Sequence, residues 1–594
     1  MILKALYDYY NRSLKNEPNS LPKYGMMNAS ISFIIVIKKT GAFVKLEDSR
    51  DKNGKGMNFV LPYGVHTNSI TPFLFWDKCM YSIDYSKEKE PLNDMDRKDE
   101  IKVKQWEKSV KTAHEKHLSF IEQCEKVYTE TNDEDFKAVV NFYKNNQLKL
   151  LHDDILWNQI EKNPDVNVTF RIEGATTVVA SKPILISFLR KDTNEEGICL
   201  ITGDKTDIIR KATPTPILNC KSSASLVSFQ KNSGYDSYGK EQGYNAPISL
   251  EAEFAFSTVM KTLISKESRN IFVIGSHKNK TARTFLFWAS SNSEAAKKSE
   301  DSLFALFGRA EDDNDDPNRR IELVRRTFMS IYNGTLLANK DDKFFILGLA
   351  PNSARIAVMY WNEQPLREFA GLISKHFMDM EIVDTRKDKK PFVGLHSILG
   401  NVTLGGKSSD ATPNLPDAVV KSIFQGLPYP ASLFQACIRR IRAEQSVNIG
   451  RAAIIKAYLN RLNDNNQNKK LDIMLDKENQ NQGYLCGRLF AVLDKIQEDA
   501  NNIHSIRERY MNAASSTPAT VFATILNLSA HHLEKLNEGK QVFYEKLKQE
   551  IIAKLDADGF PAHLDLQDQG RFFVGYYHQR QAFFMGKENK ETEE

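Results

Sequence analysis

His152, Asp153 and Asp154 are the adjacent residues best suited to metal-dependent hydrolysis. An imidazole and two carboxylates can serve as ligands of a divalent cation that activates water. One histidine and two neighbouring carboxylates do not hold a metal by themselves, and the sequence identifies no further ligands. A metal-dependent nuclease using these three residues is therefore the alternative function. We predict no catalytic residue, no metal and no cofactor.

Two other short patterns are incomplete binding sites. His114 and His117 would share one helix face, but no third histidine or cysteine lies nearby to complete a zinc site. The run Leu404–Ser408 ends in Gly-Lys-Ser like a phosphate-binding loop. That motif requires a glycine at the position occupied here by Asn401. We interpret the segment as part of a linker.

Basic residues gather on two neighbouring segments with helical periodicity, where few acids separate them. Such cations suit a groove that follows a nucleic-acid backbone, whereas a solvated helix face is the alternative. The residues are Arg439, Arg440, Arg442, Arg451, Lys456 and Arg461.

Loops near the N-terminus combine cations with amide and hydroxyl donors. These residue types contact phosphates and base edges, although an ordinary surface loop has the same composition. The candidate nucleic-acid-binding residues are Lys38, Lys39, Lys52, Lys55, Asn58, His66, Thr67, Asn68 and Ser69.

The elements that position these residues predict an α+β fold. The first part is a mixed α/β body at residues 1–410, with a helix at 2–14 and strands at 30–38 and 42–46. Further strands are expected at 166–172, 177–180, 184–189 and 198–202, then a hairpin at 271–288 and a β-β-α unit at 344–378. A linker at 400–417 leads to a helical bundle at residues 411–594, with helices at 431–443, 452–463, 485–499, 517–536, 542–555 and 566–584.

Composition fits an ordinary multidomain protein. The chain has 594 residues, and 81 basic against 76 acidic side chains give a formal charge of +5. This near-neutral balance means that any nucleic-acid surface depends on local clustering of charge. The N-terminus has no signal-peptide pattern, and no run of about 18 apolar residues could span a membrane. Six scattered cysteines favour a reducing compartment, so we predict a cytoplasmic protein that does not bind membranes.

Blocks along the whole chain resemble the large subunit of the type I-C CRISPR surveillance complex, Cascade. One departure is the loop before Phe75-Trp-Asp77, which carries Arg-Thr-Ser-Gly in that family and His66–Ser69 here. The matching blocks are Met1–Tyr10, Ile31–Val36, Phe75–Asp77, Ser228-Phe229, Ser237–Pro247, Leu347–Asn352, Ala354-Arg355, Gly487–Leu493, Ser515–Phe522 and Gly575–Phe584.

The resemblance implies a non-catalytic subunit that recognises the protospacer-adjacent motif in duplex DNA, helps to open it and supports the displaced strand. Its implied partners are the crRNA-bound backbone subunits, the target double-stranded DNA and a separate helicase-nuclease. The C-terminal helices resemble a Cascade small subunit, which an internal start near Met474 would supply as a free protein. A purely structural scaffold is a third possibility.

Overall fold

The structure is a computed structural model in which the chain forms two compact units. The N-terminal unit comprises Leu6–Thr213 and Phe229–Val259, and the C-terminal unit comprises Met1–Ala5, Pro214–Ser228 and Met260–Glu594. Residues 19, 65–69, 87–98, 190–194, 232–233, 235–238, 276–281, 308–316, 387–391, 464–465, 467–469 and 592–594 are not described, nor are the side chains of 317–320 and 586–591.

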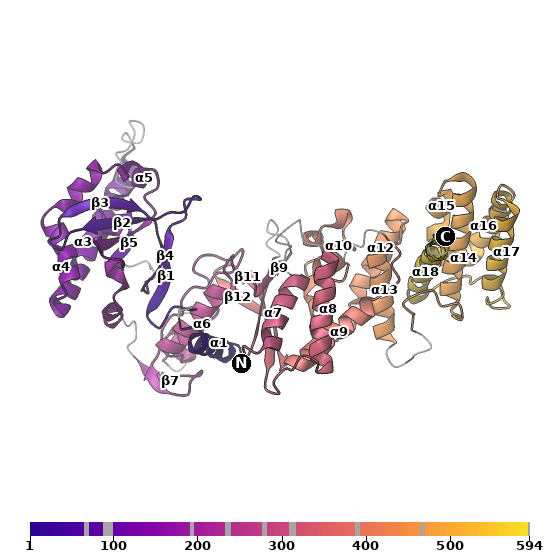
Figure 1. Ribbon diagram of the computed structural model, residues 1–594, viewed down its shortest axis with the longest axis horizontal. Coiled ribbons are helices and arrows are strands. Elements are labelled where there is room, and N and C mark those ends of the chain that lie inside the picture. Colours follow the sequence, from indigo (N-terminus) through magenta and orange to yellow (C-terminus); the bar gives the residue numbers. More distant parts are fainter. Residues whose placement is uncertain are drawn as a thin grey trace. The chain divides into compact units, whose positions relative to one another are not determined.

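The N-terminal unit is built on a mixed four-stranded sheet in the order β3-β2-β6-β5 (Figure 1). β2 pairs antiparallel with β3 and parallel with β6, and every residue of β2 is buried. Apolar side chains of α3 and α4 share one core with this sheet, which explains the unbroken apolar sequence of β2. The strands and helices are α1 (Ile2–Asn16), β2 (Phe33–Ile37), β3 (Phe43–Asp48), β5 (Trp76–Lys78), α2 (Cys79–Ser82), α3 (Glu100–Thr131), α4 (Glu134–Lys144), α5 (Trp157–Lys162), β6 (Asn167–Ile172), β7 (Glu196–Ile198), β8 (Lys205–Asp207) and α6 (Leu250–Leu263).

A separate two-stranded ribbon pairs β1 (Met26–Ile31) with β4 (Met57–Pro62) in antiparallel register. Along the chain, β1 continues through Ser32 directly into β2. β3 then pairs with β2, and β4 pairs with β1. Residues 49–56 connect the end of β3 to the start of β4, and this connection begins opposite Ser32, whose carbonyl oxygen accepts a hydrogen bond from Ser49 N. We call this excursion the 49–56 loop.

The C-terminal unit begins with an antiparallel sheet in the order β12-β11-β10-β9, which confirms the two expected hairpins. Phe285, Phe287 and Phe344 pack from this sheet into a core shared with the following helices. Phe344 stacks on Phe369 of α9 with 4.4 Å between ring centroids. The elements are β9 (Ile271–Ile274), β10 (Arg283–Ala289), α7 (Glu294–Phe307), α8 (Pro317–Asn333), β11 (Lys343–Asn352), β12 (Arg355–Pro365) and α9 (Leu366–Met380).

Helices fill the remainder of this unit and confirm the α+β class with a helical C-terminal region. One hydrophobic core runs from β9 to α18 and includes Val402 and Leu415 of the expected linker. Residue 410 therefore lies inside the unit, and a domain boundary there stays a prediction. The helices are α10 (Leu395–Gly400), α11 (Leu415–Phe424), α12 (Ala431–Glu444), α13 (Ile449–Leu462), α14 (Gln482–Asn501), α15 (Ser505–Ser516), α16 (Pro518–Leu533), α17 (Glu538–Ile552) and α18 (Leu566–Glu591).

Three expected strands are wrong. Residues 179–181 and 183–188 form short 3₁₀ helices, and β7 ends at Ile198 where a strand was expected to begin. Pro183 stands at the first turn of the second 3₁₀ helix, where its missing N–H costs nothing, whereas a sheet ladder would lose a hydrogen bond there.

Glycines let α14 and α18 pack backbone against backbone. A Cβ on Gly487 would collide with the carbonyl oxygen of Phe572, and one on Gly575 would collide with that of Tyr484. Leu489 and Phe490 are fully buried beside this contact. The helix contact that these two glycines form therefore belongs to the core of the helical region.

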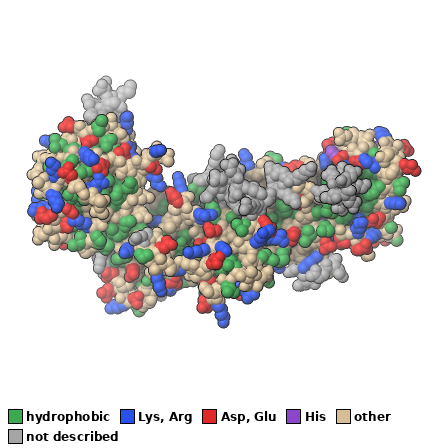
Figure 2. Space-filling view, viewed as in Figure 1, with side chains coloured by type: hydrophobic (Ala, Val, Ile, Leu, Met, Phe, Trp, Pro, Cys, Tyr) green, Lys and Arg blue, Asp and Glu red, His purple; other side chains and the backbone are tan. Residues whose placement is uncertain are grey.

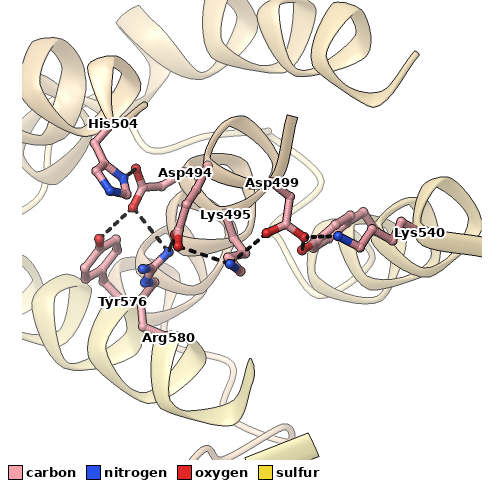
Figure 3. A network of polar contacts seen from close by, with 9 residues as sticks. Asp494, Lys495, Asp499, His504, Lys540, Tyr576 and Arg580 are labelled. Carbon is pink, nitrogen blue, oxygen red and sulfur yellow. Dashed lines mark hydrogen bonds and ion pairs between the residues drawn. The ribbon is translucent and has the colours of Figure 1, made fainter. Parts of the chain in front are cut away.

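A polar network fastens α14 to α17 and α18 (Figure 3). Lys495 Nζ lies 2.7 Å from Asp499 Oδ1, and Lys540 Nζ lies 3.0 Å from Asp499 Oδ2. Burial by itself would raise the pKa of Asp499, but hydrogen bonds from the two lysines lower it to about 2. On α18, Tyr576 donates to the buried Asp494 carboxylate at 2.8 Å.

Among the helices that the structure describes, none is both long enough and apolar enough to cross a membrane.

Candidate nucleic-acid interface

The predicted basic loops of the N-terminal unit form two separate sites. Lys38 and Lys39 are exposed at the turn between β2 and β3, whereas Lys52 and Lys55 are exposed in the 49–56 loop. These segments lie at opposite ends of β3, whose residues rise about 3.3 Å each, so about 20 Å separates them. The structure does not bring the four lysines together.

The 49–56 loop is organised by its own hydrogen bonds. Asp51 Oδ1 accepts from Asn53 N at 2.8 Å and from Lys55 N at 2.9 Å, and Asp51 N donates to Lys55 O at 2.8 Å. Gly54 adopts φ +78°, in the left-handed region where glycine is favoured. The aspartate and glycine therefore hold the loop in a defined turn that presents the lysines.

One end of the loop is attached to the four-stranded sheet and the other end to the ribbon. Arg50 forms an ion pair with Asp48 at 2.6 Å, and its guanidinium carbon lies 4.5 Å from the centre of the Phe33 ring. The hydrogen bond from Arg50 lowers the pKa of the Asp48 carboxyl group. At the other end, Ser30 Oγ donates to Gly56 O at 3.0 Å. This attachment reduces the entropy that a bound ligand would have to remove.

Lys52, Lys55 and Asn58 are exposed on this loop and on the start of β4. An ammonium group contacts phosphate, and an asparagine amide both donates to and accepts from a base edge. These three predicted residues are placed together by the fold, in a geometry suited to contacts with nucleic acid.

Asn28 is a further candidate that sequence reasoning missed. It is exposed on β1, and it lies on the same face of the ribbon as Asn58 because Ser30 pairs with Asn58 two residues further along β1. The available signal was the alternation of polar Asn28 and Ser30 with apolar Ala29 and Ile31.

His66, Thr67, Asn68 and Ser69 lie outside the described residues. The block that follows them is structural, because Asp77 Oδ2 accepts from Phe73 N at 2.9 Å and Trp76 Nε1 donates to Pro62 O at 3.2 Å. Asp77 is fully buried.

The cations of α12 have mixed surroundings. Arg439 is exposed, Arg440 forms an ion pair with Glu444 one turn later, and Arg442 Nη2 donates to Gln569 Oε1 at 2.7 Å. Of these three side chains, Arg439 is the one that the structure places in solvent as a nucleic-acid contact would require.

The guanidinium groups of α13 are used inside the unit. Arg451 is 4% exposed, and it donates to Asn401 O at 2.9 Å and to Glu444 Oε2 at 2.5 Å. Arg461 is 6% exposed, and its Nε donates to Asp379 Oδ2 at 2.6 Å. Both guanidinium groups therefore bind partners inside the C-terminal unit.

Lys456, on the same helix, is 2% exposed. Burial lowers the pKa of its ammonium group, against the attraction of Asp379, Glu381 and Asp472. Its charge therefore does not reach the protein surface in this structure.

The expectation that the six cations of α12 and α13 form one exposed groove is thus corrected. The two helices are adjacent as predicted, but α13 lies within the core and its cations face internal partners. On the face shown in Figure 2, Lys and Arg side chains are interspersed with Asp and Glu. DNA contact by each of the six residues stays a prediction.

His152, Asp153 and Asp154 do not assemble as a metal site. Asp154 accepts from Leu46 N at 2.9 Å through Oδ2, and this contact caps the outer edge of β3. The His152 ring packs on Trp157 with 3.9 Å between ring centres. Among the described residues, no group of three or more His, Cys, Asp or Glu side chains is arranged to hold a metal ion. The nuclease alternative is not supported.

Comparison with known proteins gives one family. The model of the family described as CRISPR-associated protein (Cas_Csd1) matches residues 6–584. No curated protein matches the chain.

Proposed function

The chain belongs to the CRISPR-associated protein family Cas_Csd1, and on that premise we propose that it is the non-catalytic large subunit of a type I-C RNA-guided interference complex. In this role it recognises the protospacer-adjacent motif in double-stranded DNA, promotes unwinding and R-loop formation, and supports the displaced strand. Guide pairing reads most of the target in such complexes, so the protein needs to read a short flanking motif.

The observation that carries this proposal is the 49–56 loop. Lys52 and Lys55 are exposed on a turn that Asp51 holds and that Arg50 attaches to the sheet. A loop fixed in this way positions phosphate contacts precisely, which motif reading requires.

The partners in this proposal are crRNA-bound backbone subunits, the target duplex with its displaced strand, and a helicase-nuclease that docks on the complex. We place the complex in the cytoplasm. The six cysteines are free thiols, five of them buried, as suits a protein folded in a reducing compartment.

In this proposal, translation also begins at Met474 and yields a free small subunit from the same reading frame. Met474 precedes α14, so the product contains α14–α18 with their glycine contacts. In the full chain Gly570 packs against Phe434 and Ile455. The free product exposes this surface of α18 and needs a partner there. Met474→Leu should abolish the short product, and an unchanged yield would refute the internal start.

The test of the main proposal compares complexes assembled with and without this chain, on duplex targets whose flanking bases are randomised. Motif-dependent binding should disappear without the chain. Equal binding and equal base preference in both complexes would overturn the proposal. Altered assembly with an unchanged preference would identify a scaffold.

The proposal also predicts that the purified chain does not cut labelled DNA in Mg²⁺ or Mn²⁺. Cleavage that Asp153→Ala abolishes would establish the nuclease instead.

A further inference from the structure

The β1–β4 ribbon has one face that packs into the core and an opposite face that carries two asparagines. Ala29, Ile31 and Leu61 point into the core of the N-terminal unit. The register pairs Asn28 with Val60 on the opposite face, and Ser30 with Asn58. Because side chains alternate along a strand, both asparagines share this outer face, which we call the ribbon face.

Both asparagine amides on the ribbon face are exposed. Within the described part of the chain, neither amide has a hydrogen-bond partner, although an asparagine amide offers two donors and an acceptor. The neighbouring Ser30 hydroxyl, in contrast, donates to Gly56 O. The backbone beneath the amides is held by the ladder and by the buried inner face.

The dimensions of the ribbon suit the major groove of DNA. A two-stranded antiparallel ribbon enters that groove, which is about 12 Å wide. Asn28 and Asn58 are diagonal cross-strand neighbours, so their Cβ atoms lie about 7 Å apart. This spacing is close to two base-pair steps of about 3.4 Å.

The amide chemistry selects a base. An asparagine side chain forms two hydrogen bonds with adenine in the major groove, accepting from N6 and donating to N7. Lys52 and Lys55 stand on the 49–56 loop, at the end of the ribbon where β4 begins. There they can contact the phosphates that border the groove.

We propose that the ribbon face enters the major groove of the duplex next to the guide-paired segment, and that Asn28 and Asn58 each read an adenine there. The inference rests on the proposed function and deepens it, because it assigns a groove, a base and a further specificity-determining residue, Asn28.

The first test measures binding of the assembled complex to duplexes with randomised flanking bases. Asn28→Ala and Asn58→Ala should each reduce the preference for an A·T pair about tenfold, at one position per variant, with the two positions about two steps apart. Gln105→Ala is the matched control, since this amide is exposed on α3 of the same unit. It should leave every preference unchanged.

The second test replaces adenine at the affected position with 7-deazaadenine, which lacks the major-groove acceptor N7, or with 3-deazaadenine, which lacks the minor-groove acceptor N3. The wild-type complex should lose about tenfold in affinity with the first analogue alone. The Asn28→Ala complex should be insensitive to it at its own position. Sensitivity to 3-deazaadenine alone would overturn the inference by assigning the reading to the minor groove.

Failure of the inference differs from failure of the proposed function. A wild-type complex that prefers certain flanking bases, with this preference intact in both asparagine variants, refutes the ribbon face alone. A wild-type complex that prefers G·C pairs alone at the flanking positions also refutes the ribbon face. A wild-type complex that discriminates no flanking base refutes the motif-reading function itself.

Discussion

The 49–56 loop and α13 are both rich in cations, but the fold exposes the two lysines of the loop and buries the cations of α13. On the loop, Lys52 and Lys55 are exposed. On α13, Arg461 meets a carboxylate of α9, which lies far away in the sequence. The comparison teaches that a run of basic residues predicts a binding surface only where the fold leaves the side chains exposed.

The largest expected effect is on stability, from a cation of α13. Arg461→Met should lower the free energy of unfolding of the C-terminal unit by about 3–5 kcal/mol, because it removes the ion pair of the largely buried Asp379 carboxylate. Denaturant titration measures this change. The double variant Arg461→Met/Asp379→Asn should recover part of the loss, and a single-variant loss below about 1 kcal/mol would contradict the internal role.

The next effect is on binding, from the loop. Lys52→Ala/Lys55→Ala should weaken duplex binding about tenfold for all sequences and reduce the slope of log K against log salt by about 2, since two phosphate contacts are lost. Unfolding should be unchanged. Lys104→Ala/Lys108→Ala removes two exposed lysines of α3 and serves as the control. An equal loss in the control would show that the loop has no special part.

The expected effect at Asp499 on stability is smaller than that at Arg461, because the ion pairs of Asp499 are only partly buried. Its pKa is lowered to about 2 in the folded protein, so its contribution is complete above its ordinary value near 4 and is lost as the pH falls toward 2. Asp499→Asn should cost about 1 kcal/mol of stability at pH 7 and almost nothing near pH 2.

Denaturant unfolding across pH 2–7 tests this prediction, with the exposed Asp558→Asn as control. A difference between wild type and Asp499→Asn that stays constant with pH would show that these pairs do not depend on the charge of the carboxylate.

The smallest effect on stability is expected at Arg439. Arg439→Ala should change the free energy of unfolding by less than about 0.5 kcal/mol, because the side chain is exposed. If this residue contacts the displaced strand, single-strand binding should lose about one unit of salt slope. An unchanged slope would remove α12 from the binding surface and leave the loop as the basic site.

Local pattern predicted much of the fold. The apolar run at Phe33–Ile37 became a central strand, and the periodic segment at 431–443 became α12, because burial of an apolar face decides both element types. The strand expected at 184–189 instead became a 3₁₀ helix, in which the preceding Pro183 occupies the first turn.

The candidate site was predicted in part. Lys52 and Lys55 stood out because a polar, glycine-bearing run rarely packs into a core. Asn28 was overlooked, since its place beside Asn58 depends on which residues of β1 and β4 pair. Register between segments so far apart in the chain is set by the whole sheet and by the loop between them.

By itself the amino-acid sequence determined where helices and strands form and where charge is plentiful, since both follow from residues close together in the chain. Only the tertiary structure decided which charges reach solvent. Arg461 is neutralised by Asp379 across a helix contact, whereas Lys52 stays in solvent on its loop. The physical reason is that an ion pair depends on the distance between two groups in space, and folding alone sets this distance.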